Sequence, residues 1–176
     1  FPVVAKILSR DIQHKTEARG VVLDIASPDA LAHAAREILK AAKAYKADAR
    51  IEGVQVEAME RGLAQVLVGY TRDPSVGPTV TLAAGGVLAE LYRDSAVRPA
   101  PIDVATAHAM IAEVRGLAMI TGYRNLPKGD VDALARALVS IGSLAALGGD
   151  AAIAEAEINP LIVRADGAGV VAVDAL

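Results

Sequence analysis

The order in which apolar runs, helical patterns and turn signals follow one another most strongly limits how this chain of 176 residues can fold. Two β-like runs come first, then a helical pattern, two pairs of β-like runs, two helical patterns and a last pair of β-like runs. Paired runs in the middle of the chain indicate hairpins, and hairpins imply antiparallel sheets. A doubly wound parallel sheet is therefore a poor fit, and the order predicts an α+β protein of two small lobes. In sequence order the segments are 3–8, 21–26, 27–45, 51–59, 63–71, 78–94, 103–116, 131–147 and 155–176.

The junctions between these segments define the expected organisation. Residues 60–62 are interpreted as the turn of a hairpin that joins the β-like runs on either side. We expect the first lobe to span residues 1–69 and the second lobe to span residues 70–176. Because Phe1 is not an initiator methionine and stands directly before a β-like run, we interpret the chain as a piece of a longer protein. The beginning of its first lobe is then expected to lie upstream.

Composition excludes several classes of function. The chain carries a formal net charge of −3 and no basic block, so neither nucleic acid nor an anionic membrane surface is an expected partner. Aromatic residues make up only 3% of the chain, too few for a base-stacking surface. Cysteine is absent, which rules out disulfides and thiolate metal sites. No uncharged apolar run reaches about 18 residues, so no membrane span is expected and a cytoplasmic protein is the default.

The last pair of apolar runs carries an unusual set of polar residues. Glu155, Glu157 and Asn159 stand at every second position, so on a strand they share one face. Asp166-Gly167 suits a tight hairpin turn, and a turn centred there places Asn159 opposite Asp174. Carboxylate and amide oxygens gathered in this way are ligands that Mg²⁺ prefers. The alternative is an ordinary solvated strand face.

Other candidate residues interrupt apolar runs or stand in polar loops. Lys6 lies within the first β-like run, either as an edge-strand lysine that discourages aggregation or as a cleft lysine that meets phosphate. His14 is the one histidine placed among cations in a loop, and the alternative for it is a solvated loop position. Gly85-Gly86 precedes Glu90 and either marks a bend or lets backbone approach a ligand closely. Side chains available for anionic groups are Arg93, Arg98 and Arg124.

Taken together, the segments resemble the ATP-grasp domain of ADP-forming acyl-CoA synthetases, which are relatives of the succinyl-CoA synthetase β-subunit. The resemblance covers nearly the whole chain in family order. Its most specific stretches are the opening and closing ones. The matching stretches are FPVVAKILSRDIQHK, GVQVEAM, VGYTRDPSVGP, AAGGVLAELYRD, GYR and EAEINPLIVRADGAGVVAVDAL.

The resemblance implies two α+β lobes of mainly antiparallel sheet flanked by helices, with ATP or ADP and Mg²⁺ as cofactors. It implies that Lys6 binds phosphate, that residues 56–59 form the hinge whose backbone meets adenine, and that Gln65 meets the ribose. Arg19 departs from a common glycine of the family. The implied nucleotide-binding residues are Lys6, Val56, Glu57, Ala58, Met59, Gln65, Gly85 and Gly86; the implied metal residues are Glu157, Asn159 and Asp174; and further phosphate or acid contacts are Glu90, Arg98 and Arg124.

The function implied is the nucleotide-binding part of an acid–CoA ligase that moves phosphate between ATP or ADP and a phosphohistidine. Lys6 and His14 are the implied catalytic residues, His14 as a phosphate relay. The implied partners are CoA-binding and phosphohistidine-bearing domains or subunits, with a carboxylic acid and CoA as substrates of the complete enzyme; an oligomer stays open. The alternative function is a non-catalytic, ligand-sensing or structural module fused to a protein acetyltransferase.

Overall fold

The chain folds into two compact units in a computed structural model that describes residues 1–12, 14–85 and 94–176. Unit 1 comprises Phe1–Met59 and unit 2 comprises Glu60–Leu176. The division falls after residue 59 rather than after residue 69, because residues 64–73 form one continuous strand of unit 2. Every strand pair among the described residues is antiparallel, and helices accompany both sheets, which confirms the α+β class.

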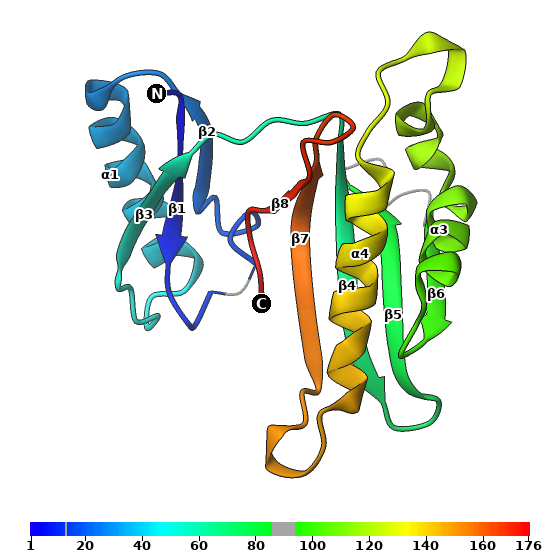
Figure 1. Ribbon diagram of the computed structural model, residues 1–176. Helices are drawn as coiled ribbons and strands as arrows, with labels where there is room; N and C mark the ends of the chain where they lie inside the picture. The colour runs from blue at the N-terminus through cyan, green and yellow to red at the C-terminus, as the bar shows by residue number, and fades with distance from the viewer. Residues whose placement is uncertain (13, 86–93) are drawn as a thin grey trace. The chain divides into compact units, whose positions relative to one another are not determined.

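Unit 1 is a three-stranded sheet with a helix packed on one face (Figure 1). The strand order is β2-β1-β3, so β1 lies at the centre. The helix begins where the Ser27 hydroxyl accepts a hydrogen bond from the Ala30 N–H at 3.2 Å. Its apolar face buries Ile38 against Ala5 and Ile7 of the central strand. The elements are β1 (Val3–Leu8), β2 (Val21–Ile25), α1 (Pro28–Tyr45) and β3 (Gly53–Ala58).

Unit 2 is a five-stranded sheet in the order β6-β5-β4-β7-β8, with helices α3 and α4 on one face (Figure 1). Val68 and Leu82 from the sheet, Met110 from α3, and Leu134 and Leu138 from α4 are fully buried together in its core. The elements are β4 (Ala64–Asp73), β5 (Gly77–Ala84), β6 (Ser95–Pro99), α3 (Val104–Glu113), α4 (Val131–Gly142), β7 (Glu155–Val163) and β8 (Val170–Ala172), with short 3₁₀ helices η1 (Arg115–Thr121), η2 (Tyr123–Asn125), η3 (Ser143–Ala146) and η4 (Gly149–Ala151).

The hairpin expected around residues 60–62 is wrong, because β3 and β4 belong to different sheets. A few residues after β3, the chain forms a backbone hydrogen bond with β7: the Leu63 N–H donates to the Val163 carbonyl at 2.8 Å. A Cβ on Gly62 would lie 2.4 Å from that carbonyl oxygen. Gly62 therefore marks a close approach between its own backbone and that of β7, and its interpretation as part of a hairpin turn is wrong.

The two later helices are shorter than their apolar patterns. The pattern at 131–147 continues past the end of α4 because the chain tightens into the 3₁₀ helix η3. Gly142 ends α4 where a Cβ would lie 3.0 Å from the Val80 side chain of β5. The second β-like run expected within 78–94 falls mostly outside the described residues, and the described part ends with β5. No helix within 1–12, 14–85 and 94–176 combines the length and the apolar character needed to cross a membrane.

Candidate functional site

Lys6 is held in the middle of the unit 1 sheet. Its strand is central rather than at an edge, so the edge-strand interpretation of this lysine is wrong. Only 8% of the residue is exposed, and its ammonium contacts the Glu57 carboxylate at 2.8 Å. The Gln55 amide donates to the other Glu57 oxygen at 2.6 Å. A buried ammonium needs an opposite charge, and this arrangement fixes the lysine head in place. Glu57, expected as a hinge residue, is therefore also the counter-ion of Lys6.

The expected hinge follows the outer edge of β3. The Met59 N–H donates to the Pro2 carbonyl at 3.2 Å, and Val3 pairs with Ala58 and Ala5 with Val56. In an antiparallel pair, hydrogen-bonded and non-hydrogen-bonded positions alternate. Val56 and Ala58 therefore direct their backbone N–H and C=O groups away from β1, and β3 is an edge strand of this sheet. Backbone groups at such an edge suit the recognition of a flat heterocycle by hydrogen bonds.

The loop that carries His14 is a compact turn. His14 is exposed, and its carbonyl accepts from the Ala18 N–H at 3.3 Å. Gly20 closes the loop through hydrogen bonds of 2.7 Å to the Lys15 carbonyl and from the Ile7 N–H. Arg19, at the position where the resembled family often has glycine, has a φ of 51°. The backbone there keeps the left-handed conformation that glycine favours, so the arginine is accommodated with local strain.

Gln65 and Gly85 lie next to each other in unit 2. The Gly85 N–H donates to the Gln65 carbonyl at 2.7 Å, and a Cβ on Gly85 would lie 2.5 Å from that carbonyl oxygen. Gly85 is thus a close backbone approach to Gln65 of the same unit, and its approach to a ligand stays a prediction. Gln65 is exposed. Gly86 and Glu90 lie outside the described residues, so only half of the glycine pair is placed.

The closing hairpin has the predicted register. Ala168 donates to the Ala165 carbonyl across the Asp166-Gly167 turn, and Leu161 pairs with Ala172. The Asn159 N–H donates to the Asp174 carbonyl at 3.0 Å, so these two residues face each other as expected.

Two side chains of the predicted polar face, those of Glu157 and Asn159, lie side by side. The Asn159 amide nitrogen contacts a Glu157 carboxylate oxygen at 3.2 Å, so the two side chains share one face of β7. Among the described residues no cluster of three or more His, Cys, Asp and Glu side chains is placed for a metal. The candidate set instead combines two carboxylates, Glu157 and Asp174, with the Asn159 amide. These hard oxygen donors fit Mg²⁺, which takes one or two protein ligands and completes its shell with phosphates and water.

Asp130 anchors this hairpin, and the sequence analysis missed it. Its carboxylate accepts from the Ala133 N–H at 2.9 Å, capping α4, and from the Gly169 N–H at 2.8 Å in the hairpin. These two backbone donors, Ala133 first, lower the pKa of Asp130 below its ordinary value. A cap signal before α4 was present in the sequence. The contact with Gly169 joins residues 39 positions apart and has no local signal.

The two described arginines expected to meet anions have partners in unit 2. Arg98 pairs with Glu113 of α3 and donates to the Val97 carbonyl at 2.9 Å. The Arg124 guanidinium lies 5.1 Å from the ring centre of Tyr123. Arg124 also has a φ of 50°, in the left-handed region. Their binding of anions stays a prediction, and Arg93 lies outside the described residues.

Comparison with known proteins gives a family-level match over the whole chain. The profile described as "ATP-grasp domain" matches residues 1–176. The chain is 37% identical to the β subunit of acetate–CoA ligase [ADP-forming] I from Pyrococcus furiosus, covering 99% of this chain and 74% of that protein. It is 35% identical to trans-feruloyl-CoA synthase FCS1 from an unknown prokaryotic organism, covering 100% of this chain. The match spans 25% of the length of the latter protein.

Solved structures show the same similarity. The dinucleotide-forming acetyl-coenzyme A synthetase 1 of Ca. Korarchaeum cryptofilum, in complex with coenzyme A, Ca-AMPCP and HgCl⁺, matches with a TM-score of 0.86 and 37% identity. The match covers 99% of this chain and 75% of that one. A second structure of that synthetase, with coenzyme A and Mg-AMPPCP and a phosphohistidine segment pointing towards the nucleotide binding site, has a TM-score of 0.76 and 34% identity. It covers 99% of this chain and 75% of that one.

Proposed function

The chain belongs to the ATP-grasp domain family, and from this membership we propose that it is the nucleotide-binding region of an ADP-forming acid–CoA ligase. The resemblance to synthetases and ligases is at the 34–37% level over nearly the whole chain, and their names give no support to the acetyltransferase-linked alternative. The match to trans-feruloyl-CoA synthase FCS1 covers all of this chain but only 25% of the synthase. We therefore propose that the complete ligase reaction belongs to a larger assembly.

The observation that carries the proposal is the polar face of the β7–β8 hairpin. The register brings Asn159 opposite Asp174 and sets Glu157 beside Asn159. We assign these three side chains to Mg²⁺ that arrives with the nucleotide. The bound ion neutralises phosphate charge as a Lewis acid. The relative crystallised with Mg-AMPPCP supports this metal and this kind of ligand.

The remaining roles follow from the contacts of each unit. Lys6 is fixed by Glu57 and supplies a positive charge for nucleotide phosphates. The outward backbone groups of Val56 and Ala58 meet the adenine edge, and Gln65, positioned by its contact with Gly85, meets the ribose. Holding a phosphoryl group in place and neutralising its charge are the main contributions a protein makes to phosphoryl transfer.

His14 is proposed as a phosphoryl acceptor on the enzyme. It is exposed on a compact loop whose neighbouring residues include cations, which suits a transient anionic adduct. In the complete enzyme, His14→Ala should abolish acyl-CoA formation while nucleotide binding survives. Acid-labile phosphate should be found on the tryptic peptide that contains His14. A fully active His14→Ala enzyme returns this residue to a solvated loop position.

The hairpin assignment is tested by measuring ADP/ATP turnover of the complete enzyme. Asp174→Asn should reduce turnover by roughly 10² to 10³-fold, the scale seen when a group that stabilises transferred charge is removed. The matched control is Asp166→Asn on the same hairpin, because Asp166 lies at the exposed turn, where its carboxylate forms a 3.7 Å ion pair with Lys128. That variant should keep normal turnover. Equal turnover of the two variants removes Asp174 from the site.

The proposed partners are a CoA-binding part and a phosphohistidine-bearing part of the same enzyme, on this polypeptide or on a second subunit. Both arrangements have support, because one relative is named as a β subunit and another is a much longer single chain. A carboxylic acid and CoA are the proposed substrates of the complete enzyme. We propose a cytoplasmic location for the enzyme, because ATP and CoA are both present there.

A further inference from the structure

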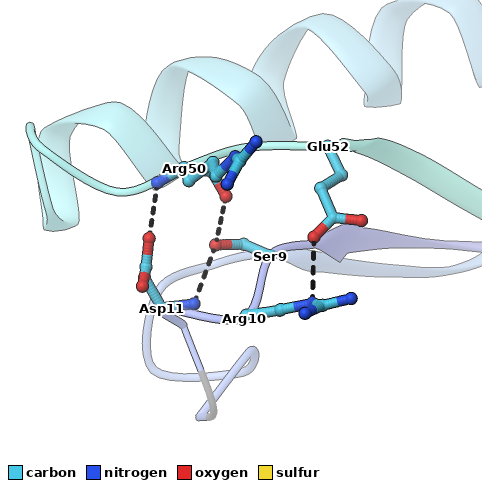
Figure 2. Close-up of polar contacts among 5 residues, drawn as sticks. All are labelled: Ser9, Arg10, Asp11, Arg50 and Glu52. Atoms are coloured by element: carbon cyan, nitrogen blue, oxygen red, sulfur yellow. Dashed lines mark hydrogen bonds and ion pairs between the residues drawn. The ribbon is translucent and has the colours of Figure 1, made fainter.

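A cluster of charged residues lies at one end of the unit 1 sheet, where β1 ends and β3 begins. The Ser9 hydroxyl donates to the Arg50 carbonyl at 2.8 Å, and an Asp11 carboxylate oxygen accepts from the Arg50 N–H at 2.7 Å. The Asp11 N–H in turn donates to the Ser9 hydroxyl at 3.2 Å. Figure 2 shows these contacts closing around the backbone of Arg50 from one side. The backbone position of Arg50 is therefore fixed before any ligand binds.

A pocket of about 310 Å³ opens at this point, lined by Arg10, Arg50 and Glu52. Among the described residues, this lining carries two positive charges and one negative charge, a net positive charge. Within this lining, Arg10 Nε forms an ion pair with a Glu52 oxygen at 3.5 Å, and 92% of the Arg10 side chain is exposed. An exposed ion pair of this kind contributes little to the free energy of folding. Among the described residues no ion pair involves the Arg50 guanidinium, and Figure 2 draws no contact to it.

We propose that this pocket is a binding site for a phosphoryl group, either inorganic phosphate or the phosphate of a small monoester. Guanidinium groups present a planar fork of N–H donors that matches phosphate oxygens. The volume lies at the lower end of the range for small-molecule sites, about 300–1,000 Å³. The lining is charged rather than apolar, which favours a small anion over a hydrophobic ligand. The proposal does not rest on the ligase function.

The pocket is separate from the hinge. On β1 and β3, Leu8 pairs with Gly53 at the pocket end, and Val3 pairs with Ala58 at the hinge end. Five residues of extended strand span about 17 Å. Backbone at the hinge and guanidinium groups at the pocket therefore lie at opposite ends of the same strand pair. A phosphate held by Arg50 does not occupy the place of an adenine ring at Val56 and Ala58.

The charges around the pocket predict a result of opposite sign for two neighbouring variants. Arg50→Gln removes the guanidinium that forms no ion pair with another described residue. This variant should weaken phosphate binding about 10-fold. Glu52→Gln removes the carboxylate of the described lining and releases Arg10, so it should tighten binding about 3-fold, the scale of one unit charge a few Å away in a wet site. Loss of a merely structural contact cannot explain tighter binding. Arg36→Gln, on the exposed face of α1, makes the same charge change as Arg50→Gln away from the pocket and should have no effect.

The test is a titration of the ¹⁵N-labelled chain with inorganic phosphate and with ribose 5-phosphate at constant ionic strength, followed by amide chemical shifts. We expect saturable shifts at Arg10, Asp11 and Glu52 for both ligands, with a dissociation constant in the millimolar range for inorganic phosphate. A tighter constant for ribose 5-phosphate identifies a monoester as the ligand, and equal constants identify phosphate itself. Acetate at the same ionic strength should give much smaller shifts.

Phosphate also suits the lysine of the nucleotide site, so Lys6→Gln serves to separate the two sites. In Lys6→Gln the shifts at Arg10, Asp11 and Glu52 should persist, and in Arg50→Gln they should fade at equal phosphate concentration. The proposal is overturned if the shifts vanish in Lys6→Gln, if Arg50→Gln and Arg36→Gln behave alike, or if Glu52→Gln weakens binding.

Discussion

The contact between Gly85 and Gln65 leads to a quantitative prediction. In Gly85→Ala the new Cβ would lie 2.5 Å from the Gln65 carbonyl oxygen and 2.7 Å from its carbonyl carbon. Ordinary van der Waals contact starts at 3.4 Å, so one segment must move by roughly 1 Å. Both atoms belong to the backbone of β4 and cannot swing aside. Overpacking of this kind costs about 1–3 kcal/mol, and we expect unit 2 to lose about 2 kcal/mol of unfolding free energy.

The matched control is Gly69→Ala on β4, the strand that carries Gln65. A Cβ on Gly69 would lie 3.5 Å from a Leu67 methyl and 3.7 Å from the Thr81 Cβ, both in the ordinary range. Because alanine also restricts the unfolded chain more than glycine does, Gly69→Ala should be neutral or slightly stabilising, by up to about 1 kcal/mol. The two substitutions add the same methyl group, one within β4 and one just after the neighbouring strand β5. Their difference therefore isolates the close approach at Gly85.

Urea unfolding followed by far-UV circular dichroism measures both variants. We expect a lower midpoint with an unchanged slope for Gly85→Ala, because the folded state is strained while its buried area stays the same. Displacing Gln65 should also lower ADP/ATP turnover of the complete enzyme by about 10²-fold, since a 1 Å misplacement of a positioning group can cost that much. A Gly85→Ala protein with the wild-type midpoint and wild-type turnover refutes both the contact and the role of Gln65.

Two further predictions concern buried polar groups of unit 2. The N–H groups of Ala133 and Gly169 lower the pKa of Asp130 in the folded state. The contribution of Asp130 to the unfolding free energy is therefore present above the unfolded pKa of about 3.9. It is lost as the pH falls through the lower pKa of the folded state. Asp130→Asn should lose stability at neutral pH and show a flatter decline in acid, measured by unfolding midpoints from pH 7 down to about 2; an unchanged acid slope contradicts this. The Tyr70 hydroxyl is buried and has no hydrogen-bond partner within the part of the chain that the structure describes. Tyr70→Phe should therefore raise the unfolding free energy by about 1 kcal/mol, and a destabilised variant would show that the hydroxyl has a partner.

Local signals in the sequence predicted the closing hairpin well. Asp166-Gly167 fixes the turn, and the turn fixes the register, so the facing of Asn159 and Asp174 followed from two residues. The pairing of strands distant in sequence was harder. Gly62 looks like a turn residue, and only its approach to Val163 reveals that β4 pairs with β7, whose paired residues lie 84 to 99 positions further along the chain.

Similar limits apply to the candidate site. Lys6 was recognised as a lysine in an apolar run, but its central strand and its Glu57 partner depend on the pairing of β1 with β3. Asp130 carries a visible helix-cap signal, while its second partner, Gly169, lies on another element. Hydrogen bonds between residues a few positions apart can be predicted from the local sequence. Contacts between different helices and strands depend on how the whole unit folds.

Calorimetric titration of the 176-residue chain with ATP, in the presence and absence of Mg²⁺, tests the central claim most directly. We expect detectable but weak binding of Mg·ATP, with a dissociation constant of roughly 0.1–1 mM. Under the proposed function this chain is one part of a larger enzyme, and only its binding-competent fraction counts. Removing Mg²⁺, or introducing Asp174→Asn, should weaken binding at least about 10-fold, the share of affinity assigned to the metal and its hairpin ligands. Absence of Mg·ATP binding by the complete parent protein, or binding that ignores both the metal and Asp174, would contradict the account.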